Sequence, residues 1–203
     1  AMDAIVNEAA KWAYIFGGKS NPKLTIRSII NRGGEQGAQH SQALHSWFAH
    51  IPGLRVVMPY SVKDARDLLI SSVLSNDPVL YIDDRWLYDK KEFLKPIKVE
   101  KINDIKPQII SYGKDITLIG AGYSVHLAKE ASKKLLKEHI SCEVIDLRVL
   151  NPFDTKLICE SVSKTGLCIA IDGGWKTCGL SSEIIASVME KVPLNKLKNN
   201  PIR

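Results

Sequence analysis

The sequence has 203 residues, of which 45% are hydrophobic and 25% are charged, and its formal net charge is +6. These proportions are typical of a globular protein with one large domain or two small ones, and no apolar run reaches the roughly 20 residues that cross a bilayer. The lysines are dispersed along the chain. That distribution favours a solvated surface over a nucleic-acid groove, which would gather basic residues beside stacking aromatic residues.

The N-terminus and the cysteines both bear on the cellular compartment. The first residues lack the basic start and apolar middle of a secretory signal, so we expect a cytoplasmic location and no membrane partner. The four cysteines share no C-x-x-C spacing, which argues against a metal site built on them. Three of them lie inside apolar stretches, where reduced, buried thiols are usual: Cys142, Cys159 and Cys168.

The first half of the chain alternates helices with strands. Apolar residues at helical spacing predict a helix from Ile5 to Phe16, which the pair Gly17-Gly18 ends. Ser61 is the expected N-cap of another helix. The remaining elements predicted here are strands at 24–30, 55–58 and 79–82, a glycine-rich loop at 31–37 and a helix at 41–50. Strands that are almost wholly apolar indicate a parallel sheet covered on both faces.

A second alternating unit follows a Lys-rich segment with two prolines. We place a linker at 89–114, between domains at 1–88 and 115–203. The second domain has predicted strands at 116–119, 142–147 and 167–171, helices at 124–139, 154–163 and 180–191, and the start of one more strand at 201–203. The predicted fold class is therefore α/β, with two mostly parallel sheets that helices cover. Because the first helix begins without a cap, we expect the chain to start inside a larger protein.

A partial nucleotide-binding motif occurs at Gly120-Ala121-Gly122, after a predicted strand. Asp146 near the end of the next strand is at about the spacing that a dinucleotide fingerprint requires. The third glycine is missing, because Val125 occupies its position and a branched side chain opposes close packing of helix on strand. We interpret the segment as a tight strand-to-helix turn, with NAD binding as the weaker alternative.

The segment Gly33 to Gln42, GGEQGAQHSQ, is the strongest candidate for chemistry. It follows a strand and delivers His40 to the predicted start of a helix, where ligand sites of parallel sheets concentrate. The positive potential of a helix start favours a neutral imidazole, which can accept or relay a proton. The residues alone are equally compatible with a His40 that only caps the helix or hydrogen-bonds the loop.

Two further histidines, His45 and His50, follow at intervals of five. Residues five apart on a helix point about 140° apart, so the three imidazoles cannot converge on one metal ion. We expect His45 at the surface and His50 buried against the following Pro52-Gly53. The aromatic pair Trp47-Phe48 is expected in the core.

Several motifs, in order along nearly the whole chain, resemble the beta subunits of the pyruvate and branched-chain 2-oxo acid dehydrogenases. These enzymes depend on thiamine diphosphate. The motifs are LTIRS at 24–28, GAQHSQ at 37–42, WFAHIPGLRVVMP at 47–59, VIDLRVLNPFD at 144–154 and DGGW at 172–175. The resemblance implies a partial transketolase-type pyrimidine-binding domain followed by a truncated transketolase C-terminal domain. It also implies oxidative decarboxylation of a 2-oxo acid and acyl transfer to a lipoyl domain.

The resemblance also implies a cofactor and site residues. Thiamine diphosphate would lie between subunits, with its diphosphate held by an alpha partner through a divalent metal. The family glutamate that contacts the ring nitrogen lies upstream of the matched region, and neither Glu8 nor Glu35 fits its motif, so no cofactor-binding residue is assigned. The family's active-site histidine falls on His40, which would assist proton transfer or acyl transfer. A potassium ion, held by backbone carbonyls, would lie near Leu24, Val73 and Asp77.

The implied partners are an alpha subunit, a second beta subunit in a heterotetramer, and the lipoyl acyltransferase component. Without them we expect this segment to be inactive. Two alternatives stay open: a relative of transketolase or deoxyxylulose-phosphate synthase, and a noncatalytic assembly module. The GAQHSQ loop favours the dehydrogenase over the first alternative. We further expect Arg148 to form a buried pair with Asp146 or Asp154, and Trp175 to anchor an interface.

Overall fold

The computed structural model describes residues 1–31 and 36–203, which form two compact units. The first comprises Ala1–Ile105 with Val149–Phe153, and the second comprises Lys106–Arg148 with Asp154–Arg203. Each contains a four-stranded sheet with three parallel strands and one antiparallel strand. The predicted α/β fold class is therefore confirmed. The segment predicted as a linker is divided between the units, with Ile105 in the first and Lys106 in the second.

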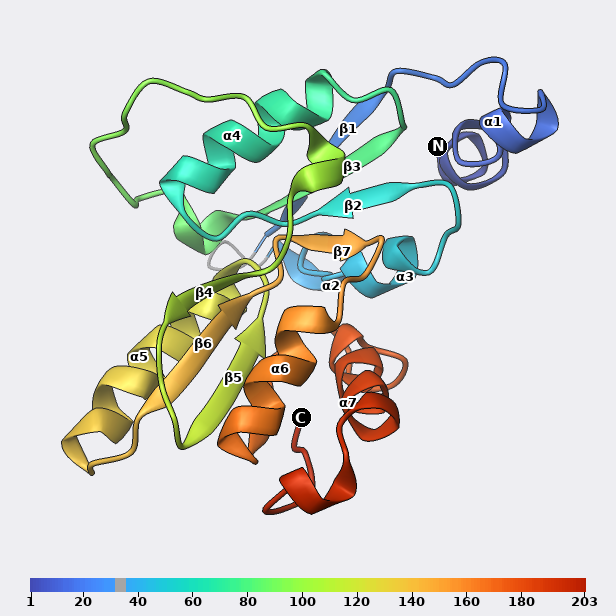
Figure 1. Cartoon of the computed structure of the whole chain (residues 1–203). Coiled ribbons are helices and arrows are strands. Elements are labelled where there is room, and N and C mark those ends of the chain that lie inside the picture. Colours follow the sequence, from blue (N-terminus) through green and yellow to red (C-terminus); the bar gives the residue numbers. More distant parts are fainter. Residues whose placement is uncertain (32–35) are drawn as a thin grey trace. The chain divides into compact units, whose positions relative to one another are not determined.

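The first sheet has the strand order β1-β3-β2-β7. Its strands are β1 (Thr25–Ile30), β2 (Arg55–Val57), β3 (Val79–Asp84) and β7 (Val149–Asn151). Helix α4 (Val62–Val73) covers one face, and α3 (His45–Ala49) lies on the other (Figure 1). The central strand β3 is buried from Val79 to Ile82, as expected for a parallel strand between helices.

The core of the first unit joins the sheet to α4 and to a segment that lacks long helices. Its buried members are Val57, Leu68, Val79, Tyr81, Ile102, Ile105 and Val149. Ile102 begins the short helix η3 (Ile102–Asp104), inside the predicted linker. The hydroxyl of Ser71 donates a hydrogen bond to the carbonyl of Glu100 (2.8 Å), which holds this segment against α4. Ser61 caps α4 as predicted, because its hydroxyl accepts a hydrogen bond from the Asp64 amide (3.0 Å).

The N-terminal helical segment is bound to the turn that follows α3. The predicted helix is present as a π-helical turn η1 (Ala4–Ala9) and a short helix α1 (Trp12–Ile15), and the chain then passes through Gly17 and Gly18, both with positive φ. The Lys11 ammonium donates to the carbonyl of Pro52 (2.6 Å). This contact joins residues that are far apart in the sequence.

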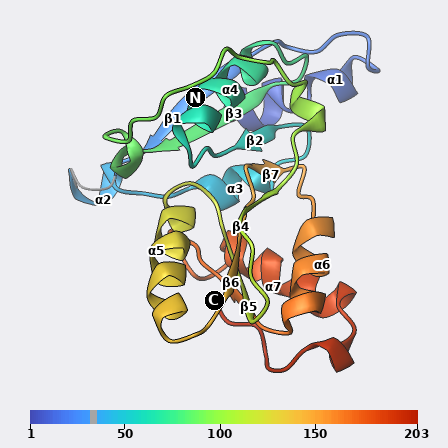
Figure 2. The same ribbon diagram turned by 60° about the vertical axis from the view of Figure 1, so that its left-hand side comes forward.

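The second sheet has the strand order β4-β6-β5-β8. Its strands are β4 (Gln108–Ser111), β5 (Ile116–Gly120), β6 (Cys142–Asp146) and β8 (Cys168–Ala170). Helix α5 (Tyr123–Lys137) lies on one side, and α6 (Lys156–Thr165) and α7 (Leu180–Lys191) lie on the other (Figure 2). The short helix η4 (Leu194–Lys196) follows, and Ile202 forms a single parallel bridge with Ile169 where a further strand was predicted.

A buried polar cluster lies between β5, β6 and α6 of the second unit. Glu143, only 1% exposed, accepts hydrogen bonds from the Lys164 ammonium and from the Gly113 amide (3.5 Å). Burial opposes ionisation of Glu143, but these hydrogen bonds outweigh it and hold the pKa of its carboxyl below the ordinary value. The Thr117 hydroxyl lies 2.8 Å from that of Thr165. The buried charge of Glu143 is thus paired, and the polar side chains around it are hydrogen-bonded.

Three predictions about the 41–50 region are wrong. His45 is buried (2% exposed), His50 is exposed, and Trp47 is 52% exposed instead of lying in the core. The reason is that α3 begins at His45 and not at Ser41, and packs on β2 and β7 with a different face from the expected one. Of the three cysteines that were predicted to be reduced and buried, Cys142 and Cys168 are free and buried, whereas Cys159 is free and half-buried.

Candidate functional site

The carboxyl ends of the parallel strands of the first sheet define the edge at which ligands are expected. Strands β1 and β3 end together, because Ile30 pairs with Asp84 in their register. Three segments leave the sheet at this edge: the one that leads to His40, the turn at 58–61 after β2, and the short helix η2 (Arg85–Leu87) after β3. Crevices outside the carboxyl ends of strands are the usual binding sites of open α/β sheets.

His40 does not lie at a helix start. It is exposed and is the last residue of a separate four-residue helix, α2 (Gly37–His40), after which Ser41 is not helical. The predicted helix-start position is therefore wrong, and the argument from positive potential does not apply. Gly37 has φ +77°, a conformation that favours glycine. The part of the predicted glycine-rich loop at 32–35 lies outside the described residues.

The residue that follows β1 is hydrogen-bonded to the residue that follows β3. A guanidinium nitrogen of Arg85, Nη1, donates to the side-chain oxygen Oδ1 of the buried Asn31 (2.5 Å). Asp84, fully buried, caps η2 by accepting a hydrogen bond from the Trp86 amide (3.2 Å). The chain that continues toward His40 therefore leaves the sheet from a fixed point.

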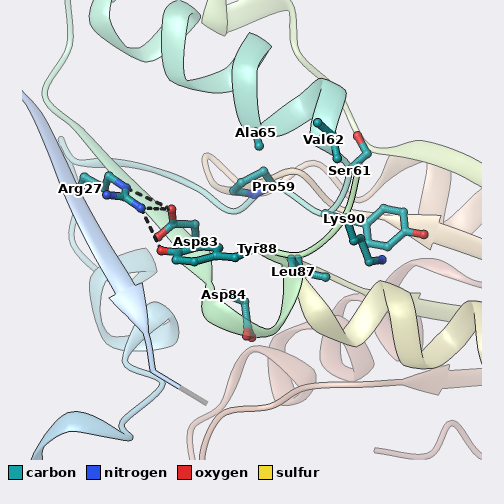
Figure 3. A pocket seen from close by; sticks show the side chains of 11 residues that line it. Arg27, Pro59, Ser61, Val62, Ala65, Asp83, Asp84, Leu87, Tyr88 and Lys90 are labelled. Atoms are coloured by element: carbon teal, nitrogen blue, oxygen red, sulfur yellow. Dashed lines mark hydrogen bonds and ion pairs between the residues drawn. The ribbon is translucent and has the colours of Figure 1, made fainter. Parts of the chain in front are cut away.

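A cavity of about 430 Å³ opens at the same edge (Figure 3). Strand ends, the first turn of α4 and the residues after η2 line it: Arg27, Pro59, Tyr60, Ser61, Val62, Ala65, Asp83, Asp84, Leu87, Tyr88 and Lys90. None of the site residues expected from the sequence is in this lining. One signal could have found it, since Asp83-Asp84 directly follows the predicted apolar strand at 79–82, and Pro59 to Ser61 follows the predicted strand at 55–58.

Charged and aromatic side chains face each other in this cavity. Nε and Nη2 of Arg27 donate to Oδ2 of Asp83 (3.0 and 2.7 Å), and Nη2 also donates to the Tyr88 hydroxyl (2.8 Å). The hydrogen bond to Asp83 raises the pKa of Arg27, and burial together with the Asp83 charge raises the pKa of Tyr88. The Lys90 ammonium lies 4.5 Å from the centroid of the Tyr60 ring, within the range of a cation–π interaction.

The predicted potassium ligands lie near the opposite edge of the sheet. The Leu24 carbonyl accepts a hydrogen bond from the Val79 amide (2.8 Å), which brings the segments before β1 and β3 together. The Asp77 carboxylate accepts from Asn21 (2.9 Å) and pairs with Arg55 (3.1 Å). Val73 is the last residue of α4. Within 1–31 and 36–203, no group of three or more His, Cys, Asp or Glu side chains could hold a metal ion, and carbonyl binding of potassium stays a prediction.

The described glutamates of the first unit do not fit the cofactor contact. Glu8, Glu92 and Glu100 are all exposed, whereas a carboxyl that is to hold a proton against a ring nitrogen needs a shielded setting. That the family glutamate lies upstream of the matched region stays a prediction. No catalytic role is therefore assigned to Glu8, Glu92 or Glu100.

Three other sequence expectations fall in the second unit. Gly122 has φ +54° immediately before α5, and Val125 is fully buried, which fits the tight-turn interpretation. Arg148 is buried, its amide donates to Asp146 (3.2 Å), and its guanidinium donates to the Lys106 carbonyl (3.3 Å). An ion pair of its guanidinium stays a prediction. Trp175 is 82% exposed, and its role as an interface anchor also stays a prediction.

Family comparisons cover nearly the whole chain. The transketolase pyrimidine binding domain matches residues 2–90, and the transketolase C-terminal domain matches residues 106–201. The chain therefore consists of two transketolase-type domains, matched one after the other. A solved structure, the inactive beta4 tetramer of a split-gene transketolase, aligns over 100% of this chain and 60% of its own, with a TM-score of 0.77 and 23% identity. That likeness shows the transketolase fold.

Curated proteins similar to this chain include several beta subunits. The acetoin:2,6-dichlorophenolindophenol oxidoreductase subunit beta of Cupriavidus necator is 38% identical over 94% of this chain and 56% of its own length. The pyruvate dehydrogenase E1 component subunit beta of Rickettsia bellii is 37% identical (94% and 58%). The mitochondrial 2-oxoisovalerate dehydrogenase subunit beta of Dictyostelium discoideum is 39% identical (94% and 52%). The predicted resemblance is confirmed, and the chain spans about half the length of these relatives.

Proposed function

We propose that this chain is the beta-subunit portion of a thiamine diphosphate-dependent 2-oxo acid dehydrogenase. The complete enzyme would oxidatively decarboxylate a 2-oxo acid and transfer the acyl group to a lipoyl domain. One observation carries the proposal: relatives named as beta subunits of pyruvate and 2-oxoisovalerate dehydrogenases are 35% to 39% identical over 94% of this chain. Because these names cover two different acids, the proposal is limited to the 2-oxo acid class.

His40 is the proposed catalytic residue. It is exposed on a short helix beyond the carboxyl end of β1, where a substrate group carried by another component could reach its imidazole. The imidazole would donate or accept a proton during acyl transfer, which is typically worth about 10² to 10⁴ in rate. Thiamine diphosphate, when bound, would supply the stabilisation of the carbanion that decarboxylation requires.

The proposal includes partners that complete the site. An alpha subunit would hold the diphosphate through a divalent metal, a glutamate outside this sequence would contact the ring nitrogen, and a second beta subunit would complete a heterotetramer. The lipoyl acyltransferase component would accept the acyl group. We further propose a cytoplasmic location and a potassium ion near the carbonyls of Leu24, Val73 and Asp77.

The decisive experiment is reconstitution of the full-length enzyme with its alpha subunit and lipoyl domain. We expect His40→Ala to lower the rate of lipoyl acylation by about 10² to 10⁴, the range for loss of a positioned acid or base. The matched control, His50→Ala, removes an exposed imidazole of the same unit and should leave the rate within about twofold. Full acylation by His40→Ala would overturn the catalytic assignment and favour a noncatalytic assembly module.

Substrate assays separate the dehydrogenase from its alternatives. Pyruvate and 2-oxoisovalerate should both be tested, together with acetoin, because one relative of comparable identity is named for acetoin. Turnover of acetoin alone would replace the 2-oxo acid assignment. Turnover of sugar phosphates, without lipoyl acylation, would support the transketolase or deoxyxylulose-phosphate synthase alternative.

A further inference from the structure

We propose that the cavity beside the first turn of α4 binds an uncharged aromatic ligand that carries a hydrogen-bond acceptor, such as an aromatic ketone. The proposal goes beyond the proposed function, since none of the cavity's lining residues is His40 or a proposed potassium ligand. The volume of about 430 Å³ lies within the range of small-molecule sites, which is about 300 to 1,000 Å³.

The walls of the cavity suit a flat hydrocarbon body. The aliphatic side chains of the lining are Pro59, Val62, Ala65 and Leu87. In Figure 3, Pro59 lies between Arg27 on one side and Ser61 on the other. A ring between the aliphatic side chains would displace water from apolar surface, which is the main source of affinity in mostly apolar sites.

The charges of the lining favour an uncharged ligand. The lining has two cations and two carboxylates, so that its formal charge is zero: Arg27, Lys90, Asp83 and Asp84. Asp83 is paired with Arg27 (2.7 Å), and Asp84 is fully buried and caps η2. The Lys90 ammonium lies over the Tyr60 ring. An ionised ligand would lose its hydration in this cavity without gaining a counter-charge, which is costly.

Two hydrogen-bond donors of the lining remain available to a ligand. The Ser61 oxygen accepts from the Asp64 amide (3.0 Å), but among the described residues none accepts a hydrogen bond from the Ser61 hydroxyl. Asp83 and Tyr88 use Nε and Nη2 of Arg27, and within the described part of the chain no hydrogen bond uses Nη1. Because both available groups are donors, the ligand has to supply an acceptor. A carbonyl oxygen at Ser61, on a ring that lies between the aliphatic walls, meets this requirement.

The test uses the chain itself with acetophenone, a flat aromatic ketone, as the probe. We expect saturable chemical-shift changes at the Ala65 and Leu87 amides with a Kd of about 1 to 10 mM, which is usual for a ligand of about nine non-hydrogen atoms. Benzoate has nearly the same shape with a negative charge, and benzylammonium carries a positive charge, so both should bind at least about fivefold more weakly. Changes that do not saturate up to about 30 mM would overturn the proposal. Equal or tighter binding of either ion would overturn it too.

Two variants, each with a matched control, test the location. Ser61→Asp keeps the cap of α4 but removes the hydroxyl donor, and it should weaken acetophenone about threefold to tenfold, as expected for the loss of one hydrogen bond. Its control, Ser28→Ala, removes an exposed hydroxyl outside the lining and should leave the affinity unchanged. Val62→Trp fills the cavity and should abolish saturable binding. Its control, Val99→Trp, places the same side chain at an exposed position outside the lining and should bind acetophenone as the wild type does.

Circular dichroism establishes that each variant is folded. Wild-type affinity in folded Val62→Trp would refute the site. If Val62→Trp does not fold, Ser61→Asp decides, because it retains the cap, and wild-type affinity in that variant would refute the contact with Ser61 and the proposal with it.

Discussion

The buried Glu143 carboxylate offers the sharpest test of how the second unit is stabilised. We expect Glu143→Gln to destabilise the chain at pH 7, because the neutral amide keeps the size of the side chain but loses the charge-assisted hydrogen bond from Lys164. Such a bond contributes about 1.5 to 3 kcal/mol. The Lys164 side chain is 48% exposed, and solvent screening reduces this to about 1 to 2 kcal/mol.

The effect should depend on pH with a defined sign. Hydrogen bonds hold the pKa of Glu143 below its ordinary value of 4.5 in the folded chain. Its stabilising contribution is therefore fully present above about pH 4.5, and it is lost as the pH falls through the lowered pKa, because the unfolded state then binds the proton more readily. Glu143→Gln has no group that titrates there, so the difference between the two proteins should shrink on acidification.

Urea denaturation followed by circular dichroism, at intervals from pH 3 to pH 7, measures the loss of stability in Glu143→Gln and its dependence on pH. The matched control is Lys133→Met, which breaks the exposed ion pair with Glu130 and should leave the unfolding midpoint unchanged at every pH, as expected for a surface pair. The reasoning fails if Glu143→Gln unfolds at the wild-type midpoint at pH 7. It fails equally if the difference is as large at pH 3 as at pH 7.

Three further predictions concern packing, capping and thiol chemistry. Gly53 has φ +88°, and a Cβ there would lie 1.9 Å from the carbonyl oxygen of Ala10, so Gly53→Ala should cost about 2 kcal/mol or more in thermal unfolding and expose the N-terminal helical segment to proteolysis. An unchanged melting temperature would contradict that contact. Ser61→Ala removes the cap of α4 and should cost about 1 kcal/mol in the same assay, while Ser61→Asp should retain the wild-type stability. Burial raises the pKa of the Cys168 thiol to about 12. A thiol reagent at pH 8 should therefore label the exposed Cys178 in the native chain and leave Cys168 unlabelled until the chain unfolds. Mass spectrometry of the labelled peptides measures this, and labelling of Cys168 in the native chain would contradict the prediction.

Local sequence patterns were sufficient for several elements of the fold. The helical spacing that follows Ser61 predicts α4, and the hydroxyl cap is present as expected. The apolar run from Val79 to Ile82 predicts the buried strand β3. These elements follow from side-chain periodicity and from one capping residue, both of which act over a few neighbouring positions.

The 37–50 region was predicted less well because its structure depends on packing. The pattern from Ser41 to His50 is compatible with one continuous helix, but α3 begins only at His45 and packs on β2 and β7. Strand β7 (Val149–Asn151) is distant in the sequence and is too short to produce a periodic signal. The burial of His45 was therefore not foreseeable from the local pattern.

The sequence by itself determined the α/β class, most of the buried strands and the position of the GAQHSQ motif that contains His40. These features depend on hydrophobic periodicity and on the order of motifs along the chain. Only the tertiary structure decided that residues 149–153 return to the first unit, that Ile102 and Ile105 complete its core, and that Arg27, Asp83 and Lys90 line one cavity. Such groupings arise from strand pairing and side-chain packing between distant segments, and the separation of two residues along the chain does not specify them.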